Sequence, residues 1–224
     1  MASTTIDTET ELSAVNAILG AIGQSPVTSL GNTSSTTTTS GGTTVTTNSY
    51  ENPEVAFIYN LLRDSNVDVQ SEGWHFNTEK HVEYKPDSTT KKIAVGNDVL
   101  KMDVTDGWTL KHYDVVKRNG YLYDKYDHTD EWDDVTEMYL DITRLISYED
   151  LPEVFKRYII YKASTRAATQ LVGNPQLARL LAQQEALGRA SCLEYDCTQG
   201  NHSMFNFPED SSFTTFQPWR TLRR

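Results

Sequence analysis

The sequence predicts an α+β fold, made of a four-helix bundle, an inserted antiparallel β module and an extended C-terminal arm. Three observations lead to this prediction. Apolar residues recur at helical spacing in two segments before residue 80 and in two after residue 147. Between them the pattern changes to the alternation of strands, and after residue 198 no period remains. We therefore expect a helical domain of residues 1–79 and 148–198, a β module at 80–147 and an arm at 199–224.

The first helix is expected within residues 9–23, where apolar side chains fall three, four and seven residues apart. These side chains are Leu12, Val15, Ile18, Leu19 and Ile22. Gly23 and Pro26 mark its end, because glycine accepts the left-handed conformation and proline cannot continue a helix.

A threonine-rich stretch follows at residues 32–49, with nine Thr, four Ser and Val45 as its one apolar side chain. Branching at Cβ disfavours threonine in helices, and Gly41-Gly42 interrupts any strand. We expect a solvated loop inserted between two helices. A threonine-rich hairpin centred on the two glycines is the alternative if the stretch is ordered.

Two Asn-Pro pairs predict helix starts, because Asn caps free amides and proline suits the first helical position. Asn52-Pro53 begins the second helix, which is expected to end at Gly73. Its buried face is predicted to be Val55, Ile58, Leu61, Leu62 and Val69. Asn174-Pro175 begins the fourth helix, with Leu177, Leu180, Leu181 and Leu187 expected together on one side.

The third helix is expected between Pro152, in its first turn, and Gly173. Its predicted face combines Phe155, Tyr158, Ile159, the stem of Lys162, and Leu171. Since about two residues separate it from the fourth helix, the two are expected to pack as an antiparallel hairpin.

Within 80–147, five segments have the alternation or the Val, Ile and Tyr content of strands: KHVEY, KKIAV, VLKMDV, KHYDVV and EMYLDI. Asn119-Gly120 predicts a tight hairpin, because a type I′ turn needs two positive φ angles. We therefore expect a small antiparallel meander.

The composition excludes several classes of function. The 224 residues include 20 basic and 31 acidic side chains, a net charge of −11, and no apolar run approaches the roughly 20 residues of a membrane span. The sequence pI near 4.9 argues against duplex DNA binding, which needs clustered Lys and Arg. The first residues lack the basic and apolar regions of a secretion signal. Cys192 and Cys197 have no His at zinc-ligand spacing, so we expect reduced thiols.

No segment predicts catalysis, a metal or a cofactor, and we expect none of these. Residues 121–141 have a local charge of −7 from eight acids and Lys125, but their spacing does not match a calcium loop. A solvated acidic loop or a subunit contact is expected there. The five His are scattered, and Ser191-Cys192 lies in no hydrolase motif.

Large aromatic side chains at element ends and in loops predict an interaction surface, because such residues are favoured at interfaces. The candidates are Trp74, Phe76, Trp132, Phe213, Phe216, Trp219, Arg220, Arg223 and Arg224. Trp74 and Phe76 are also expected to be buried, anchoring the chain after the second helix. The arm, with its arginines, is expected to pack on a neighbouring subunit or another assembly partner, and packing over its own bundle is the alternative.

Four segments carry a resemblance to a known family. They are ELSAVNAILGAIGQSPVTSL, then NPEVAFIYNLLRDSNVDVQSEGWHFNTEK with Glu72, Gly73, Trp74, Phe76 and Asn77, then RNGYLYDKYDHTDEW, and YEDLPEVFKRYIIYKASTRAATQLVGN. Together, and in this order, they resemble the tail tubular protein A family, the adaptor or head–tail connector of short-tailed bacteriophages (podoviruses).

The resemblance implies a structural virion protein that is not an enzyme. Such adaptors form a homododecameric ring that joins the portal protein to the tail nozzle protein (tail tubular protein B) and offers a docking surface for the tail fibre protein. DNA is implied to pass through an acidic channel without specific binding during genome ejection, and no membrane is involved. The implied location is the virion tail, after assembly in the host cytoplasm. A carbohydrate hydrolase and a host-surface-binding tail protein are the alternatives.

Overall fold

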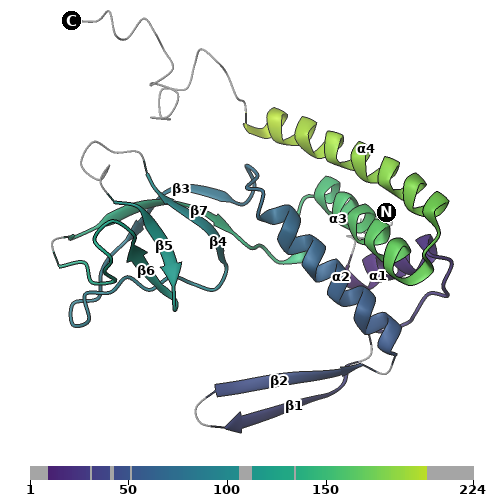
Figure 1. Ribbon diagram of the computed structural model, residues 1–224, viewed down its shortest axis with the longest axis horizontal. Coiled ribbons are helices and arrows are strands. Elements are labelled where there is room, and N and C mark those ends of the chain that lie inside the picture. The colour runs from purple at the N-terminus through teal and green to yellow at the C-terminus, as the bar shows by residue number, and fades with distance from the viewer. Residues whose placement is uncertain are drawn as a thin grey trace, which may run out of the picture. The chain divides into compact units, whose positions relative to one another are not determined.

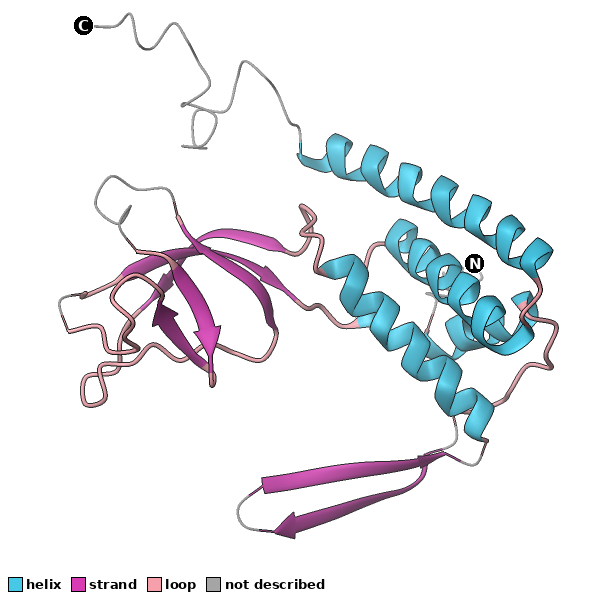
Figure 2. Cartoon of the chain, in the orientation of Figure 1, coloured by secondary structure: helices cyan, strands magenta, loops and turns pink. Residues whose placement is uncertain are grey.

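The protein is described by a computed structural model that covers residues 10–30, 32–40, 43–50, 52–105, 113–133 and 135–200 (Figure 1). Its four α-helices and small antiparallel sheets confirm the predicted α+β class. The chain divides into two compact units. The first consists of residues up to Val69 together with Ser147–Glu194, and the second of Gln70–Ile146 together with residues from Tyr195 onward. Figure 2 distinguishes the helices from the strands by colour.

The helices begin and end close to the predicted positions. They are α1 (Glu11–Ala21), α2 (Pro53–Gln70), α3 (Glu153–Ala167) and α4 (Pro175–Gly200), with a 3₁₀ turn η1 at Tyr148–Asp150 and a π-helical turn η2 at Ala168–Val172. Both Asn-Pro starts are confirmed, because the Asn52 and Asn174 side chains each accept a hydrogen bond, at 3.0 Å, from the amide two residues later.

The predicted buried faces of the first three helices are largely confirmed. α1 packs on α3, and the Tyr59 hydroxyl of α2 donates to the Glu11 carboxylate of α1 at 2.8 Å. The expected core residues that are buried are Val15, Ile18, Leu19, Val55, Ile58, Leu61, Leu62, Val69, Phe155, Tyr158 and Ile159.

α3 and α4 run antiparallel, as predicted. The Cys192 thiol of α4 donates to the carbonyl oxygen of Val154, near the start of α3, at 3.5 Å. Earlier in α4, Gly188 lies against Tyr158 and Tyr161, which come later in α3. Residues late in one helix thus meet residues early in the other.

Three leucines placed on the predicted helix faces are exposed in the structure. Leu171 is 44% exposed, Leu180 is 61% exposed and Leu187 is 69% exposed. Leu171 lies in the π-helical turn, sixteen residues after Phe155, which places it about 160° around the helix from that side chain. Leu180 and Leu187 each precede a residue of the inward face of α4, so they point roughly 100° away from it.

The threonine-rich stretch forms a hairpin, so the expectation of an unstructured loop is wrong and the alternative is correct. Strands β1 (Asn32–Ser40) and β2 (Thr43–Tyr50) pair antiparallel from Asn32↔Tyr50 to Ser40↔Thr43. Cβ branching disfavours helix but suits extended backbone, and two glycines between strands are a common hairpin connection.

The second unit contains the remaining strands: β3 (Thr78–Tyr84), β4 (Val99–Val104), β5 (Val115–Arg118), β6 (Tyr121–Asp124) and β7 (Met138–Arg144). β3, β7 and β4 form an antiparallel sheet in that order, and β5 pairs with β6. Asn119 and Gly120 have φ angles of 51° and 81°, which confirms the predicted type I′ turn.

The predicted strand KKIAV is wrong, because Ala94 makes only an isolated bridge, to Tyr121. Its side chains still alternate inward, since Ile93 and Val95 are both buried. They belong to a core formed by Ile93, Val95, Val99, Val115, Leu122, Trp132, Met138, Leu140 and Ile142. Alternation therefore identified the core residues of this segment without identifying its hydrogen bonding.

Candidate functional site

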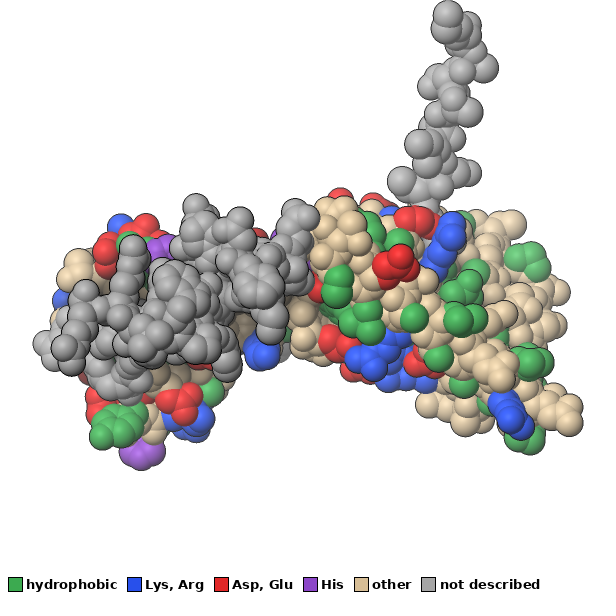
Figure 3. Space-filling model, turned by 90° about the horizontal axis from the view of Figure 1, so that it is seen from above, with side chains coloured by type: hydrophobic (Ala, Val, Ile, Leu, Met, Phe, Trp, Pro, Cys, Tyr) green, Lys and Arg blue, Asp and Glu red, His purple; other side chains and the backbone are tan. Residues whose placement is uncertain are grey.

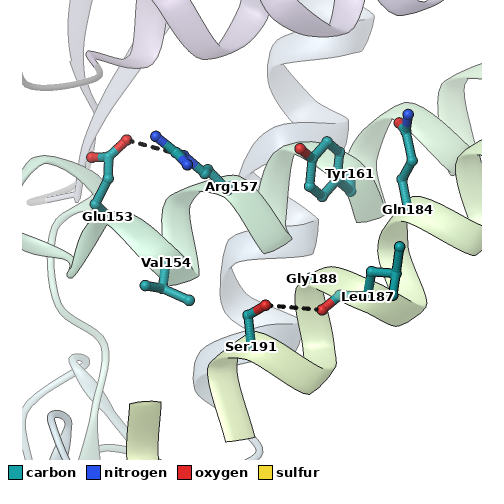
Figure 4. Close-up of a pocket in the computed structure, with 8 residues that line it drawn as sticks. All are labelled: Glu153, Val154, Arg157, Tyr161, Gln184, Leu187, Gly188 and Ser191. Carbon is teal, nitrogen blue, oxygen red and sulfur yellow. Dashed lines mark hydrogen bonds and ion pairs between the residues drawn. The ribbon is translucent and has the colours of Figure 1, made fainter. Parts of the chain in front are cut away.

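The helical unit contains a groove between α3 and α4 with a volume of about 460 Å³ (Figure 4). Residues from both helices line it: Glu153, Val154, Arg157 and Tyr161 of α3, and Gln184, Leu187, Gly188 and Ser191 of α4. Val154, Leu187 and Tyr161 supply apolar surface. The groove is thus a concave surface of mixed character between two antiparallel helices.

Gly188 explains how closely the two helices approach beside this groove. A Cβ atom at this position would lie 3.1 Å from Cδ2 of Tyr161 and 3.5 Å from Cα of Tyr158. The first distance is tighter than an ordinary van der Waals contact, so a larger residue would push α4 away from α3.

The polar groups around the groove have partners within their own helices. Arg157 and Glu153 form an ion pair at 3.7 Å, one turn apart on α3. The Ser191 hydroxyl donates to the carbonyl oxygen of Leu187 at 3.2 Å (Figure 4). This hydroxyl is therefore engaged in α4, and Glu153, the carboxylate that lines the groove, is paired with Arg157, so the arrangement favours binding of apolar side chains over nucleophilic chemistry.

Large aliphatic side chains are exposed on the same helix. Leu180, Leu187 and Leu193 are 61%, 69% and 48% exposed, and of these Leu187 lines the groove. Viewed from above, the helical part of the molecule shows several separate hydrophobic side chains on its surface (Figure 3). Covering such a side chain on binding removes apolar surface from water, which is favourable.

The second unit contains a smaller acidic hollow of about 250 Å³. It is lined by Tyr113, Asp124, Asp127, Thr129, Glu131, Trp132, Asp133 and Val135. Asp124 is buried, and its Oδ1 accepts from the amide of Tyr126 at 2.8 Å. Its Oδ2 has no hydrogen-bond partner in the described part of the chain. The predicted acidic segment therefore includes one carboxylate directed into the protein.

No three His, Cys, Asp or Glu side chains within the described residues are placed to share a metal ion. Among those same residues, no helix combines the length and apolar character needed to cross a membrane.

On the outer face of the sheet, neighbouring charges shift the pKa values of exposed groups. The hydrogen bond from Lys85, at 2.6 Å, lowers the pKa of Glu83, and the same contact raises the pKa of Lys85. The Tyr139 hydroxyl donates to Glu137 at 3.2 Å, which raises the pKa of Tyr139. Solvent surrounds all of these groups, so the shifts reflect surface pairs rather than a catalytic site.

A comparison with known families now identifies the chain. The sequence model of the tail tubular protein family matches residues 40–202, which is well over half of the 224 residues. The chain belongs to the tail tubular protein family. No curated protein matches it. The matched span runs from the end of β1 to the end of α4, so the resembling segment in and after α1 precedes it.

Family membership places this tail tubular protein among the structural proteins of the bacteriophage tail, which assemble with other tail proteins. The family is structural rather than enzymatic. A surface that binds protein is therefore the functional site to look for.

Of the nine candidate interface residues predicted from the sequence, the three that the structure describes do not line the groove. Trp74 and Trp132 are 5% and 3% exposed, and Phe76 is half-buried. The other six candidates, Phe213, Phe216, Trp219, Arg220, Arg223 and Arg224, lie outside the described residues. The interface role of all nine stays a prediction.

Trp74 is buried as expected, whereas Phe76 is only half-buried, and the neighbouring residues explain how Trp74 is held. Gly73 has a φ of 82°, which turns the chain sharply after α2. Asn77, 1% exposed, accepts from the amide of Trp74 at 2.9 Å and donates to the carbonyl oxygens of Gln70 and Arg144. The Gly-Trp-x-Phe-Asn signature is thus a structural device that fixes the end of α2 on β7.

Sequence reasoning missed the groove. Helical spacing places Leu187 on the predicted leucine side of the fourth helix, but its exposure depends on how α4 rotates against α3. The sequence signal that could have identified it is Gly188, a helix-interior glycine, which favours close approach of two helices.

Proposed function

We propose that this tail tubular protein is a ring-forming adaptor that joins the portal protein to the tail nozzle protein. Membership of the tail tubular protein family is the observation that carries the proposal. In this role the subunits form a homododecamer, and the ring offers docking surface for the tail fibre protein. Assembly takes place in the host cytoplasm, before the virion is complete.

The charge of the chain supports a channel for DNA in this ring. Each subunit has a net charge of −11, so twelve copies concentrate negative charge around one axis. An acidic lining repels DNA phosphates over about 10 Å at moderate salt, which prevents the duplex from adhering during genome ejection. The DNA thus passes without specific binding.

We propose that each predicted domain makes a different set of contacts in the assembly. A four-helix bundle of residues 1–79 and 148–198 supplies contacts between subunits, because large aliphatic side chains are exposed on α4. The β module of residues 80–147 faces the nozzle or the exterior, and the arm of residues 199–224 reaches a neighbouring subunit or the portal.

Mass measurement of the intact assembly tests the proposal. Purified protein is measured alone, with the portal protein, and with an unrelated acidic protein as a control. We expect a complex containing twelve copies of 25.3 kDa, about 304 kDa, that forms alone or on the portal. A chain that stays monomeric with the portal present would contradict the proposal. Breakdown of host polysaccharide by the pure protein, abolished by a carboxylate substitution, would assign the hydrolase function instead.

A further inference from the structure

The strongest unassigned feature of the helical unit is the groove between α3 and α4 with Leu187 at its edge. Leu187 is 69% exposed and lines the groove, whereas Leu180, two turns earlier on α4 and 61% exposed, does not. Burying one leucine side chain is worth about 1.5–3 kcal/mol, so a partner that covers Leu187 gains substantially.

The chemistry of the groove selects an apolar occupant. The Glu153–Arg157 pair and the Ser191 hydroxyl satisfy their polar groups within α3 and α4. A charged ligand would compete with the Glu153–Arg157 pair, whereas an aromatic or aliphatic side chain can lie on Val154, Tyr161 and Leu187 without disturbing it. An apolar centre with a polar rim is the usual composition of a protein-binding site.

The chain itself contains a segment of the complementary composition. Residues 201–224 include five large aromatic side chains, namely Phe205, Phe207, Phe213, Phe216 and Trp219. Three Arg and two acids give this segment a charge of +1, so the preceding 200 residues have a charge of −12. An aromatic segment of opposite charge is attracted to the acidic body of the subunit as well as to the groove.

Its length and point of departure favour a neighbouring copy over the same chain. The segment begins at Gly200, the end of α4, whereas the groove residues of α4 lie 9–16 residues earlier along that helix. To enter its own groove, the segment must double back along α4. Extended, 24 residues span roughly 80 Å, about twice the length of the 26-residue helix α4, so the segment can reach the next subunit.

We propose that the groove between α3 and α4 binds the aromatic C-terminal segment, residues 201–224, of a neighbouring copy of this chain. Each copy then gives one segment and receives another, which is a heterologous contact suited to a ring. The inference rests on the proposed self-assembly and adds the surface that accepts the arm.

Site-specific photo-crosslinking of the full-length chain tests this inference. A benzophenone amino acid replaces Gln184, which lines the groove, and in a control chain it replaces Leu193, which does not. Each protein is prepared as an equal mixture of ¹⁴N and ¹⁵N chains, assembled, irradiated and digested. We expect peptides from residues 201–224 crosslinked to the position-184 peptide, with mixed isotopes, at ten times or more the yield seen from position 193.

Two matched substitutions sharpen the test in the position-184 background. Leu187→Asp is expected to reduce this crosslink at least fivefold, and Leu180→Asp to leave it within twofold, because only Leu187 lines the groove. Both side chains are exposed, so both variants are expected to fold, which circular dichroism checks. Phe213→Ser with Phe216→Ser removes rings from the segment itself and should also reduce the yield, with the groove intact.

Three outcomes overturn the inference. Crosslinks that join chains of one isotope only place the segment in its own groove. Crosslinks from position 184 that miss residues 201–224 assign the groove to another occupant. Equal losses from Leu187→Asp and Leu180→Asp exclude the groove as the specific receptor. A mass measurement on the same samples distinguishes failure of this inference from failure of the proposed function. Chains that assemble but lack the crosslink contradict only this inference. Chains that do not assemble contradict both.

Discussion

Asn77 offers the sharpest test of how the second unit is held together. Its side chain makes three hydrogen bonds, accepting from the amide of Trp74 at 2.9 Å and donating to the carbonyl oxygens of Gln70 at 2.9 Å and Arg144 at 3.0 Å. These bonds join the end of α2, the turn after it and the last residue of β7. One side chain thus links residues 67 positions apart in the sequence.

The expected cost of Asn77→Ala follows from this geometry. Each hydrogen bond contributes roughly 1 kcal/mol net, and Asn77 is 1% exposed, so water does not replace the lost bonds in the folded state. The three bonds together predict a loss of about 3 kcal/mol in the free energy of unfolding, a large fraction of the stability of a small domain. Asn77→Asp keeps the acceptor for Trp74 but brings a negative charge to two carbonyl oxygens, so it should cost at least as much.

Urea unfolding followed by tryptophan fluorescence measures this loss. Trp74 and Trp132 are buried and belong to the second unit, so their signal reports on the unit that contains Asn77. Asn97→Ala is the matched control, because Asn97 is exposed and accepts one long bond, 3.4 Å from Lys117. The reasoning is refuted if Asn77→Ala costs less than about 0.5 kcal/mol, or no more than the control.

Three further predictions follow from other parts of the fold. Lys156 is 2% exposed and donates to the carbonyl oxygen of Glu149 at 2.9 Å. Lys156→Met should keep or raise the free energy of unfolding, because it removes a buried charge and keeps the packing of the side chain. Lys156→Ala should lower that free energy by about 2 kcal/mol in urea unfolding. Deleting residues 34–47 shortens the β1–β2 hairpin and should change the free energy of unfolding by about 1 kcal/mol or less; failure to obtain soluble protein would contradict this. Lys85→Ala should raise the pKa of Glu83 toward its ordinary value of 4.5 in an NMR titration, since the hydrogen bond from Lys85 lowers it. Because that pKa is lowered, the contact stabilises the fold above it and the benefit is lost as pH falls through it.

Local chemistry made several elements predictable from the sequence. Asn52 and Asn174 cap their helices with their own side chains, a contact that spans two residues. The β5–β6 turn depends on the two positive φ angles of Asn119 and Gly120, which these two residue types adopt readily. The preference in each case is contained within a few consecutive residues, so no knowledge of the tertiary structure is required.

The hydrogen bonding of strands was less predictable, because it depends on distant partners. The segment KKIAV has the alternation of a strand, and its Ile93 and Val95 side chains are buried. Its backbone nevertheless forms only an isolated β-bridge, at Ala94. The threonine-rich stretch shows the reverse: almost all its side chains are polar, and its backbone still pairs as β1 and β2. Alternation of apolar and polar residues predicts which side chains are buried, and a high threonine content predicts extended backbone. Neither pattern predicts which strand pairs with the segment.

The groove between α3 and α4 could not be predicted from the sequence, because it also depends on contacts between distant residues. Helical spacing predicts one side of α4 with Leu177, Leu180, Leu181 and Leu187 together, and leucines are usually buried. Which stripe faces α3 is decided instead by Gly188, whose missing side chain lets Tyr158 and Tyr161 approach. α4 therefore buries Leu181 and leaves Leu180 and Leu187 exposed. A partner that covers these two side chains removes apolar surface from water, and this connects the packing of α4 to assembly.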